Sequence, residues 1–179
     1  MKSIVVYCAS SMGVNPVYRQ AAEQTGKALA ERQIRLIYGG GNGGLMGVVA
    51  DAALANGGSV TGIIPNFLAE LEVAHQNLTE IEFVDTMHER KLRMVSLSDG
   101  VITLPGGYGT LDELFEILAW RQLDIFHGPI GVLNIDGFYD ALLAHADRMT
   151  AEGFLKPQNR ALILVADNVE ELLNKMQNA

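Results

Sequence analysis

The sequence predicts an α/β fold, a parallel sheet of about seven strands with helices on both faces. Short apolar runs alternate with longer amphipathic runs to the end of the chain, which is the pattern of parallel strands joined by helices. Several short runs are apolar almost throughout, as strands covered on both faces are. No linker, repeat or low-complexity stretch divides the sequence, so we expect residues 1–179 to form a single domain.

Seven runs have the composition of strands. They cover residues 4–8, 34–38, 59–64, 81–84, 100–104, 130–134 and 161–165. Six amphipathic runs between and after them predict helices over residues 17–32, 45–56, 87–97, 111–123, 138–149 and 169–177. Gly57 and Gly58 give the second helix a C-terminal stop. Residues 65–79 are the least regular part of the chain.

The composition limits what the protein can bind. The net charge of -8 argues against a general nucleic-acid binder, because phosphate backbones need a basic surface. The single cysteine, Cys8, allows no internal disulfide, and it ends an apolar run as a small buried hydrophobe would. The N-terminus lacks the features of a signal peptide, and no apolar run approaches the roughly 20 residues that span a bilayer. We therefore expect a cytoplasmic protein that binds neither nucleic acid nor membranes.

Three predicted strands are followed by loops of small residues, at the edge of the sheet where α/β proteins bind ligands. These loops are residues 9–13 (ASSMG), 39–47 (GGGNGGLMG) and 104–113 (LPGGYGTLDE). Each could be a tight strand-to-helix turn, but such loops also present backbone N–H groups to an anion at a helix N-terminus. Three of them at one edge favour a phosphorylated ligand.

Two common nucleotide motifs fit poorly. Gly39, Gly41 and Gly44 match the G-x-G-x-x-G of dinucleotide-binding folds, but the acid expected at the end of the next strand is replaced by Pro65-Asn66. An ATP-type P-loop is disfavoured further, because no Gly-Lys-Ser/Thr follows any of the glycine loops.

A basic pair lies on the third predicted helix, residues 87–97. Thr86 and Glu89 form a capping box that begins this helix, and Arg90 and Lys91 follow beside an apolar stripe of Met87 and Met94. Basic side chains in that position need a partner. The partner could be an internal carboxylate or a ligand phosphate, which arginine binds with two donors.

Acidic residues close the third glycine loop. Thr110 and Glu113 have capping-box spacing, so Glu113 could simply cap its helix, and Asp112 and Glu116 could favour the helix N-terminus. A carboxylate nevertheless repels a phosphate bound nearby. It would suit a site that breaks an N-glycosidic bond, where it stabilises the ribosyl cation or activates water.

With these motifs in place, the chain resembles the LOG family, the cytokinin riboside 5′-monophosphate phosphoribohydrolases. The resemblance runs from YCASS through GGGNGGLMG and MHERK to PGGYGTLDE and GPIGVLNIDGFYDALL, essentially the whole chain. It implies a Rossmann-like nucleotide-binding domain that hydrolyses a nucleoside 5′-monophosphate to free base and ribose 5-phosphate. It also suggests a homodimer.

The resemblance implies roles for individual residues. Arg90 and Glu113 are the expected catalytic pair. Nine further residues of the quoted motifs are expected to bind the substrate: Lys91, Gly106, Gly107, Gly109, Thr110, Met87, Ser10, Gly40 and Gly41. No metal is expected, because the four histidines lack metal-ligand spacing.

Relatives with this motif set have also been labelled lysine decarboxylases, but no residues here suggest a pyridoxal phosphate site with a Schiff-base lysine, and no organic cofactor is expected.

Two other functions stay open. A non-catalytic nucleotide-binding or carrier protein could use the same fold, and an NAD-dependent dehydrogenase is disfavoured by the missing acid. The sequence leaves open whether cytokinin nucleotides or AMP are the physiological substrate. It also leaves open whether Glu113 stabilises the cation or activates water.

Overall fold

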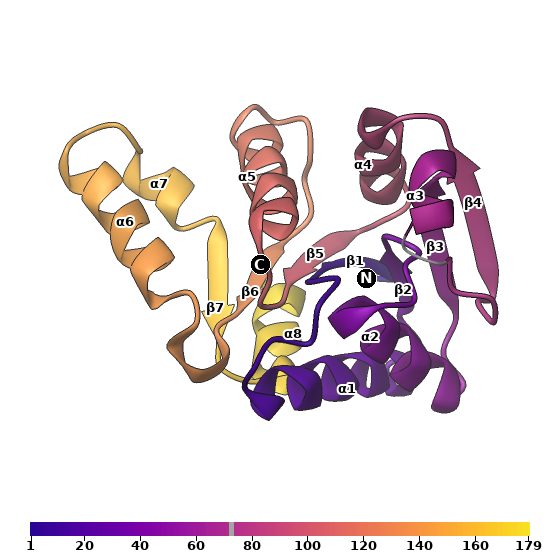
Figure 1. Ribbon diagram of the computed structural model, residues 1–179. Coiled ribbons are helices and arrows are strands. Elements are labelled where there is room, and N and C mark those ends of the chain that lie inside the picture. Colours follow the sequence, from indigo (N-terminus) through magenta and orange to yellow (C-terminus); the bar gives the residue numbers. More distant parts are fainter. Residues whose placement is uncertain (72–73) are drawn as a thin grey trace.

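The strands of the computed structural model, which describes residues 1–71 and 74–179, form a parallel sheet in the order β4-β3-β2-β1-β5-β6-β7 (Figure 1). The strands are β1 (Ser3–Tyr7), β2 (Arg35–Tyr38), β3 (Val60–Pro65), β4 (Glu80–Val84), β5 (Gly100–Thr103), β6 (Ile130–Leu133) and β7 (Ile163–Ala166). All seven predicted strands are therefore confirmed. Side chains of the central strands are buried almost throughout, whereas the edge strands β4 and β7 are half-buried.

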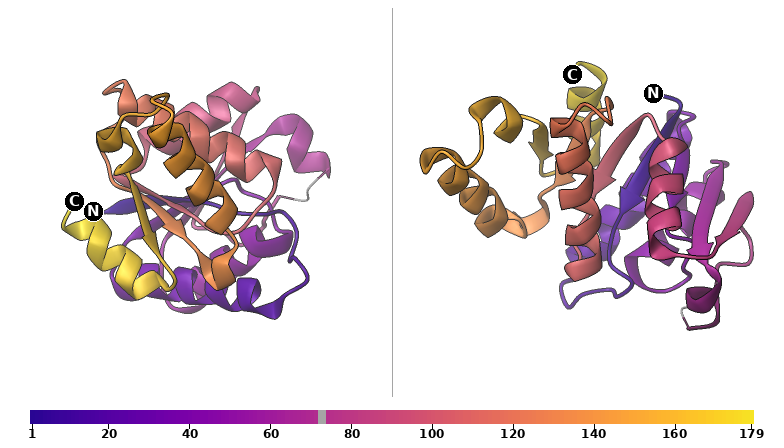
Figure 2. Two further views of the ribbon diagram at one scale, coloured as in Figure 1. Left: turned by 90° about the vertical axis from the view of Figure 1, so that its left-hand side faces the viewer. Right: turned by 90° about the horizontal axis from the view of Figure 1, so that it is seen from above.

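Helices cover both faces of the sheet, as predicted (Figures 1 and 2). They are α1 (Pro16–Glu31), α2 (Gly44–Ala55), α3 (Asn66–Leu71), α4 (Met87–Ser96), α5 (Tyr108–Gln122), α6 (Asp140–Ala151), α7 (Pro157–Arg160) and α8 (Val169–Gln177), with a 3-10 turn at Ile135–Gly137. Helices α1, α2 and α8 pack on one face through residues such as Leu29, Val49 and Leu172. Helices α4 and α5 pack on the other through Met94, Leu114 and Ile117.

Side-chain caps begin the helices α1, α4 and α8. Asn15 caps α1 by accepting from the Val17 N–H at 3.2 Å, and Pro16 occupies the first helical position. Gly57, with φ of +75°, follows the end of α2 and confirms the predicted stop.

Within the described residues 65–71 and 74–79, part of the stretch that is least regular in sequence, the structure has the short helix α3, which was not predicted. Two predicted helix starts were wrong. Helix α6 begins at Asp140 rather than residue 138, because the 3-10 turn precedes it. Helix α5 begins at Tyr108, three residues before the predicted start, with consequences for the acidic residues that are described below.

The order of the strands places a crevice at the centre of the sheet. The chain adds β2, β3 and β4 on one side of β1, then crosses over and adds β5, β6 and β7 on the other. The loops after β1 and β5 consequently diverge at their carboxyl ends, which is where open α/β sheets bind ligands. Within the described ranges, no helix has the length and apolar character needed to cross a membrane.

Candidate active site

A cavity of about 280 Å³ lies at this switch point between β1 and β5. It is lined by residues of the β1–α1 loop, α2, α4 and the start of α5: Cys8, Ala9, Ser10, Ser11, Met46, Met87, Arg90, Gly107, Tyr108, Gly109, Thr110, Asp112 and Glu113. Seven of the eleven predicted site residues are therefore together at one cavity.

The N-terminus of α5 forms one wall of the cavity. Gly107 is the N-cap residue and provides no side chain to cap the helix. The first N–H groups of a helix lack intrahelical acceptors, so those of Tyr108, Gly109 and Thr110 are suited to binding an anion. Gly107 and Gly109 are exposed at this wall, which lets a ligand approach the backbone closely.

The predicted capping box of Thr110 and Glu113 is wrong. Because α5 begins at Tyr108, Thr110 is already inside the first turn and buried, and Glu113 lies one turn further along the helix. A Cβ atom at Gly106 would overlap the Thr110 side chain. Gly106 thus allows this packing and is not among the residues that line the cavity. Glu113 has no capping role to explain its position.

The glycine loop of residues 39–47 mainly supports the cavity from behind, and of its residues Met46 lines the cavity. The N–H groups at the start of α2 donate to the β1–α1 loop, from Leu45 to Ser11 O at 3.3 Å and from Met46 to Ala9 O at 3.2 Å. Those donors are therefore used inside the protein. Gly40 and Gly41 are both buried and do not line the cavity, and Gly40 has a φ of +76° against Ile63 and Ile64. The expectation that these two glycines contact substrate is not supported by their placement.

Arg90 is buried at the cavity and held by backbone carbonyls. Its Nε donates to Ile63 O at 3.1 Å and its Nη2 donates to Gly39 O at 2.8 Å. A Cβ atom at Gly39 would overlap the guanidinium, so only glycine leaves room for it. Since both carbonyl partners are neutral, the guanidinium charge remains available to an anionic ligand.

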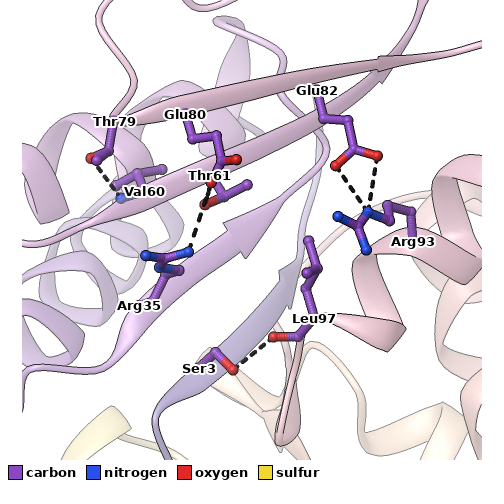
Figure 3. Close-up of polar contacts among 9 residues, drawn as sticks. All are labelled: Ser3, Arg35, Val60, Thr61, Thr79, Glu80, Glu82, Arg93 and Leu97. Carbon is purple, nitrogen blue, oxygen red and sulfur yellow. Dashed lines mark hydrogen bonds and ion pairs between the residues drawn. The ribbon is translucent and has the colours of Figure 1, made fainter.

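Helix α4, which carries Arg90, is fixed at both ends. The predicted capping box is confirmed, with Glu89 N–H donating to Thr86 Oγ1 at 3.1 Å. Figure 3 shows the later part of the helix, where Arg93 Nε donates to both Glu82 carboxylate oxygens at 2.9 Å. Ser3 Oγ donates to Leu97 O at 2.7 Å just beyond the helix (Figure 3). These contacts hold α4 against β4 and β1 and so define the position of Arg90.

Glu113 is half-buried at the cavity wall opposite α4. Burial raises the pKa of its carboxyl from the ordinary value to about 7. Arg90 and Lys91 oppose this rise in the pKa, while Asp112 and Glu116 add to it. A carboxyl group with a pKa near neutrality, in a cleft beside a buried arginine, is typical of catalytic sites.

Lys91 lies between α4 and α5 and is not among the residues that line the cavity. Its Nζ lies 3.1 Å from Asp112 Oδ2 and 3.0 Å from Glu116 Oε1. The expectation of a substrate-binding Lys91 is not supported by this placement, and the partner of the side chain is an internal carboxylate pair. The ion pairs with Lys91, rather than a preference for the helix N-terminus, explain why Asp112 and Glu116 are acidic.

Lys91 also fits poorly as a Schiff-base lysine. Burial lowers its pKa, but the hydrogen bonds to Glu116 and Asp112 outweigh burial and raise the pKa above the ordinary value. Formation of an imine requires the neutral amine, which this environment disfavours. The residues present therefore do not fit a pyridoxal phosphate site at Lys91.

Six residues that line the cavity were not predicted as site residues: Cys8, Ala9, Ser11, Met46, Tyr108 and Asp112. All six lie within the loops and motifs that the sequence had already pointed to. Cys8 is buried, and burial raises the pKa of its thiol well above the usual range, which disfavours a reactive thiolate. In the described parts of the chain, no group of three His, Cys, Asp or Glu side chains is arranged to hold a metal ion.

Comparison with known proteins gives consistent matches along the chain. A family model described as "Possible lysine decarboxylase" matches residues 46–176. The cytokinin riboside 5′-monophosphate phosphoribohydrolase LOG7 of Arabidopsis thaliana is 45% identical over 176 residues, which cover 98% of this chain and 81% of LOG7. The "Probable cytokinin riboside 5′-monophosphate phosphoribohydrolase LOGL5" of Oryza sativa subsp. japonica is 46% identical over 176 residues, covering 98% of this chain and 72% of the relative.

Solved structures with the same fold are more distant in sequence. The molybdenum cofactor binding protein of Rippkaea orientalis aligns with a TM-score of 0.74 at 22% identity, over 99% of this chain and 97% of that one. The molybdenum cofactor carrier protein of Chlamydomonas reinhardtii aligns with a TM-score of 0.70 at 16% identity, over 98% and 96%. At these identities the likeness supports the fold alone.

The family model covers most of the chain, and the two plant relatives match nearly all of it at close to half identity. The motifs at the cavity are those on which the resemblance rests. The chain therefore belongs to the LOG family of phosphoribohydrolases, enzymes that hydrolyse an N-glycosidic bond.

Proposed function

We propose that this protein hydrolyses the N-glycosidic bond of nucleoside 5′-monophosphates, either cytokinin riboside 5′-monophosphates or AMP, to free base and ribose 5-phosphate. The observation that carries the proposal is the juxtaposition, in one cavity, of uncapped N–H groups, a buried arginine and a carboxyl group of raised pKa. The names of the plant relatives support this substrate class.

In the proposed complex, the phosphate binds at the N-terminus of α5. The N–H groups of Tyr108, Gly109 and Thr110 donate to its oxygens, and the helix dipole favours the negative charge. Glu113 lies four residues after Gly109, about one helical turn or 6 Å further along the same helix. A ribose 5-phosphate spans a similar length between its phosphate and C1′, so the carboxylate reaches the reacting carbon while staying clear of the phosphate.

The chemistry then follows from the charge that develops. The bond between C1′ and the base nitrogen breaks, its electron pair stays with the base, and C1′ becomes cationic. Ionised Glu113 stabilises this cation or takes a proton from the attacking water, whose oxygen bonds to C1′. The base takes up one proton and water gives up one, so the reaction balances without a metal or an organic cofactor. Arg90 fixes the phosphate and ribose relative to Glu113.

The size of the cavity supports a mononucleotide. About 280 Å³ is at the lower end of ligand pockets and suits one nucleotide rather than the two of a dinucleotide. An NAD-dependent dehydrogenase therefore gains no support here. A carrier that holds a nucleotide intact remains the alternative outcome of the decisive experiment.

That experiment is incubation with a panel of nucleoside 5′-monophosphates, including AMP and isopentenyladenosine 5′-monophosphate, with chromatography of the free bases. Steady release of base, with one ribose 5-phosphate formed for each base, supports the proposal. Stoichiometric binding without release would instead identify a nucleotide carrier. The ratio of kcat/KM values across the panel decides whether the cytokinin nucleotide or AMP is preferred.

We expect the 5′-phosphate to be required. Adenosine should be cleaved with a kcat/KM about 10²–10⁴-fold lower than AMP, because it forfeits at least two charge-assisted hydrogen bonds of about 1.5–3 kcal/mol each. Initial rates of adenine release from the two compounds at equal concentrations measure this ratio. Similar rates for adenosine and AMP would contradict a phosphate site at α5.

The pH dependence should report the ionisation of Glu113. Both proposed roles need the carboxylate, so kcat/KM for AMP should rise with pH through a midpoint near 7, the raised pKa of this group. The substrate phosphate titrates near pH 6 and adds a second inflection, or limb, to the curve of kcat/KM against pH. The residual activity of Glu113→Gln provides the control, because only the limb near pH 6 should persist. A rate that falls as the pH rises through 7 would indicate that Glu113 acts as a general acid instead.

We also propose that the protein is a cytoplasmic homodimer. Helix α5 carries the large apolar side chains Phe115, Leu118 and Trp120, of which Phe115 is exposed, while the other two pack partly on their own core. Exposed Leu123 and Ile125, just beyond α5, extend the apolar surface. Light scattering at micromolar concentration should give twice the 19.4 kDa of the chain, and Ile125→Asp should favour the monomer. A wild-type mass of 19.4 kDa would reject the dimer.

A further inference from the structure

Charged side chains of α4 and α5 face one another in the cavity wall and beside it. Helix α4 contributes the adjacent cations Arg90 and Lys91, and α5 contributes the carboxylates Asp112, Glu113 and Glu116. The two cations have different partners. Arg90 is bound to backbone carbonyls and lines the cavity, whereas the Lys91 ammonium lies within 3.1 Å of Asp112 and 3.0 Å of Glu116.

Asp112 and Glu116 are four residues apart, so they share one face of α5, and Glu113 lies beside both. Only 9% of the Lys91 side chain is exposed, against 60% for Asp112 and 26% for Glu116. A nearly buried ammonium that meets two carboxylates is already satisfied and offers little to a substrate phosphate. It ties α4 to α5 within one residue of both proposed catalytic groups.

We propose that Lys91 is a positioning residue, which binds no substrate and instead pairs with Asp112 and Glu116, so that their charge is compensated next to Glu113 and α5 keeps its place beside Arg90. This inference rests on the proposed function of the site. It replaces direct phosphate binding by Lys91 with an effect transmitted through two carboxylates.

The charges around Glu113 support this role. Arg90 and Lys91 face it from α4, Asp112 and Glu116 from α5, and the neutral Tyr7 and Cys8 from the end of β1. Lys91 lowers the pKa of Glu113, and the two neighbouring carboxylates raise it. Loss of the ammonium would leave both carboxylates uncompensated, which disfavours the Glu113 carboxylate and repels the substrate phosphate.

The test compares pH profiles of kcat/KM for AMP in four variants. Lys91→Met should move the midpoint upward by roughly one pH unit, lowering the rate about five-fold at pH 7 and much less above pH 9. Glu116→Gln should move the midpoint in the opposite direction, because it removes one repelling carboxylate while Asp112 still pairs with Lys91. Lys91→Arg should restore the wild-type midpoint, since it keeps the charge. Lys27→Met is the matched control, because exposed Lys27 lies on α1, pairs with Glu31 in the described part of the chain, and its loss changes the net charge equally.

A direct phosphate contact would give a different result. Lys91→Met would then raise KM at every pH while the midpoint stayed in place, and that outcome overturns the proposal. A second measurement does not depend on turnover. Carboxyl ¹³C NMR of Glu113 should show its titration midpoint rising in Lys91→Met and falling in Glu116→Gln, and unchanged midpoints would also overturn the proposal. A wild-type protein that releases no base but shows these NMR shifts would refute the proposed function and leave the role of Lys91 standing.

Discussion

Replacement of Glu113 by glutamine is expected to slow the release of free base from AMP about 10²–10⁴-fold at pH 8. Glutamine has nearly the same shape but carries no charge to stabilise the ribosyl cation and no base to activate water. The affinity for AMP should be kept or slightly increased, because a carboxylate near the phosphate cradle is removed. Turnover and equilibrium binding of AMP, measured on the same preparation, separate the two effects.

Thermal melting of the same variant provides both a fold check and a second signature. The pKa of Glu113 is higher in the folded protein than the ordinary value of 4.5. Its favourable contribution is therefore complete below about pH 4.5 and is lost as the pH rises through about 7. Glu113→Gln should consequently melt close to wild type at pH 4 and above it at pH 8. Unchanged turnover would refute the catalytic role. A melting temperature below that of the wild type at every pH would show that glutamine disrupts the fold.

Replacement of Arg90 is expected to have the second largest effect. Arg90→Lys should lower kcat/KM for AMP about 10²–10³-fold, mainly by weakening substrate binding. An ammonium keeps the charge, but it cannot donate to the Ile63 and Gly39 carbonyls and also bind the ligand with a planar pair of donors. Titration calorimetry with AMP, together with steady-state kinetics, measures the loss.

Arg93→Lys is the matched control for Arg90→Lys. Arg93 lies on the same helix, three residues away, and pairs with Glu82 on the outer strand β4 rather than with the cavity (Figure 3). Its substitution should change stability slightly and leave AMP binding intact. Equal losses of affinity in the two variants would show that the position of α4, rather than the Arg90 guanidinium, determines binding.

The fold could be predicted from the sequence because it depends on local patterns. Buried parallel strands read as apolar runs, such as residues 100–104, and the amphipathic runs between them mark the helices. Capping chemistry located the start of α4, because Thr86 and Glu89 satisfy the helix N-terminus by themselves. The three short helical elements at residues 66–71, 135–137 and 157–160 were not predicted, because helices of one or two turns are too short to show a periodic pattern of apolar residues.

The start of α5 shows where local patterns mislead. Thr110 and Glu113 have the spacing of a capping box, but the helix begins at Tyr108 and Gly107 occupies the cap position. An N-terminus without a side-chain cap is a local disadvantage, and sequence rules favour the residue that would remove it. The tertiary structure keeps these N–H groups at the cavity and buries Thr110 against Gly106.

By itself the sequence determined the class of fold, the edge of the sheet where a ligand binds, and the motifs that carry Arg90 and Glu113. Only the tertiary structure decided which residues of those motifs line the cavity and which make contacts inside the protein. It turned Gly39 toward the Arg90 guanidinium, buried Gly40 and Gly41 away from the cavity, and placed Lys91 on Asp112 and Glu116. The physical reason is that Arg90 and Lys91 are adjacent cations on one helix and point in different directions. Which of them meets a cavity and which meets a carboxylate depends on where α5 packs, and that is set by the crossover from β4 to β5 rather than by any local pattern.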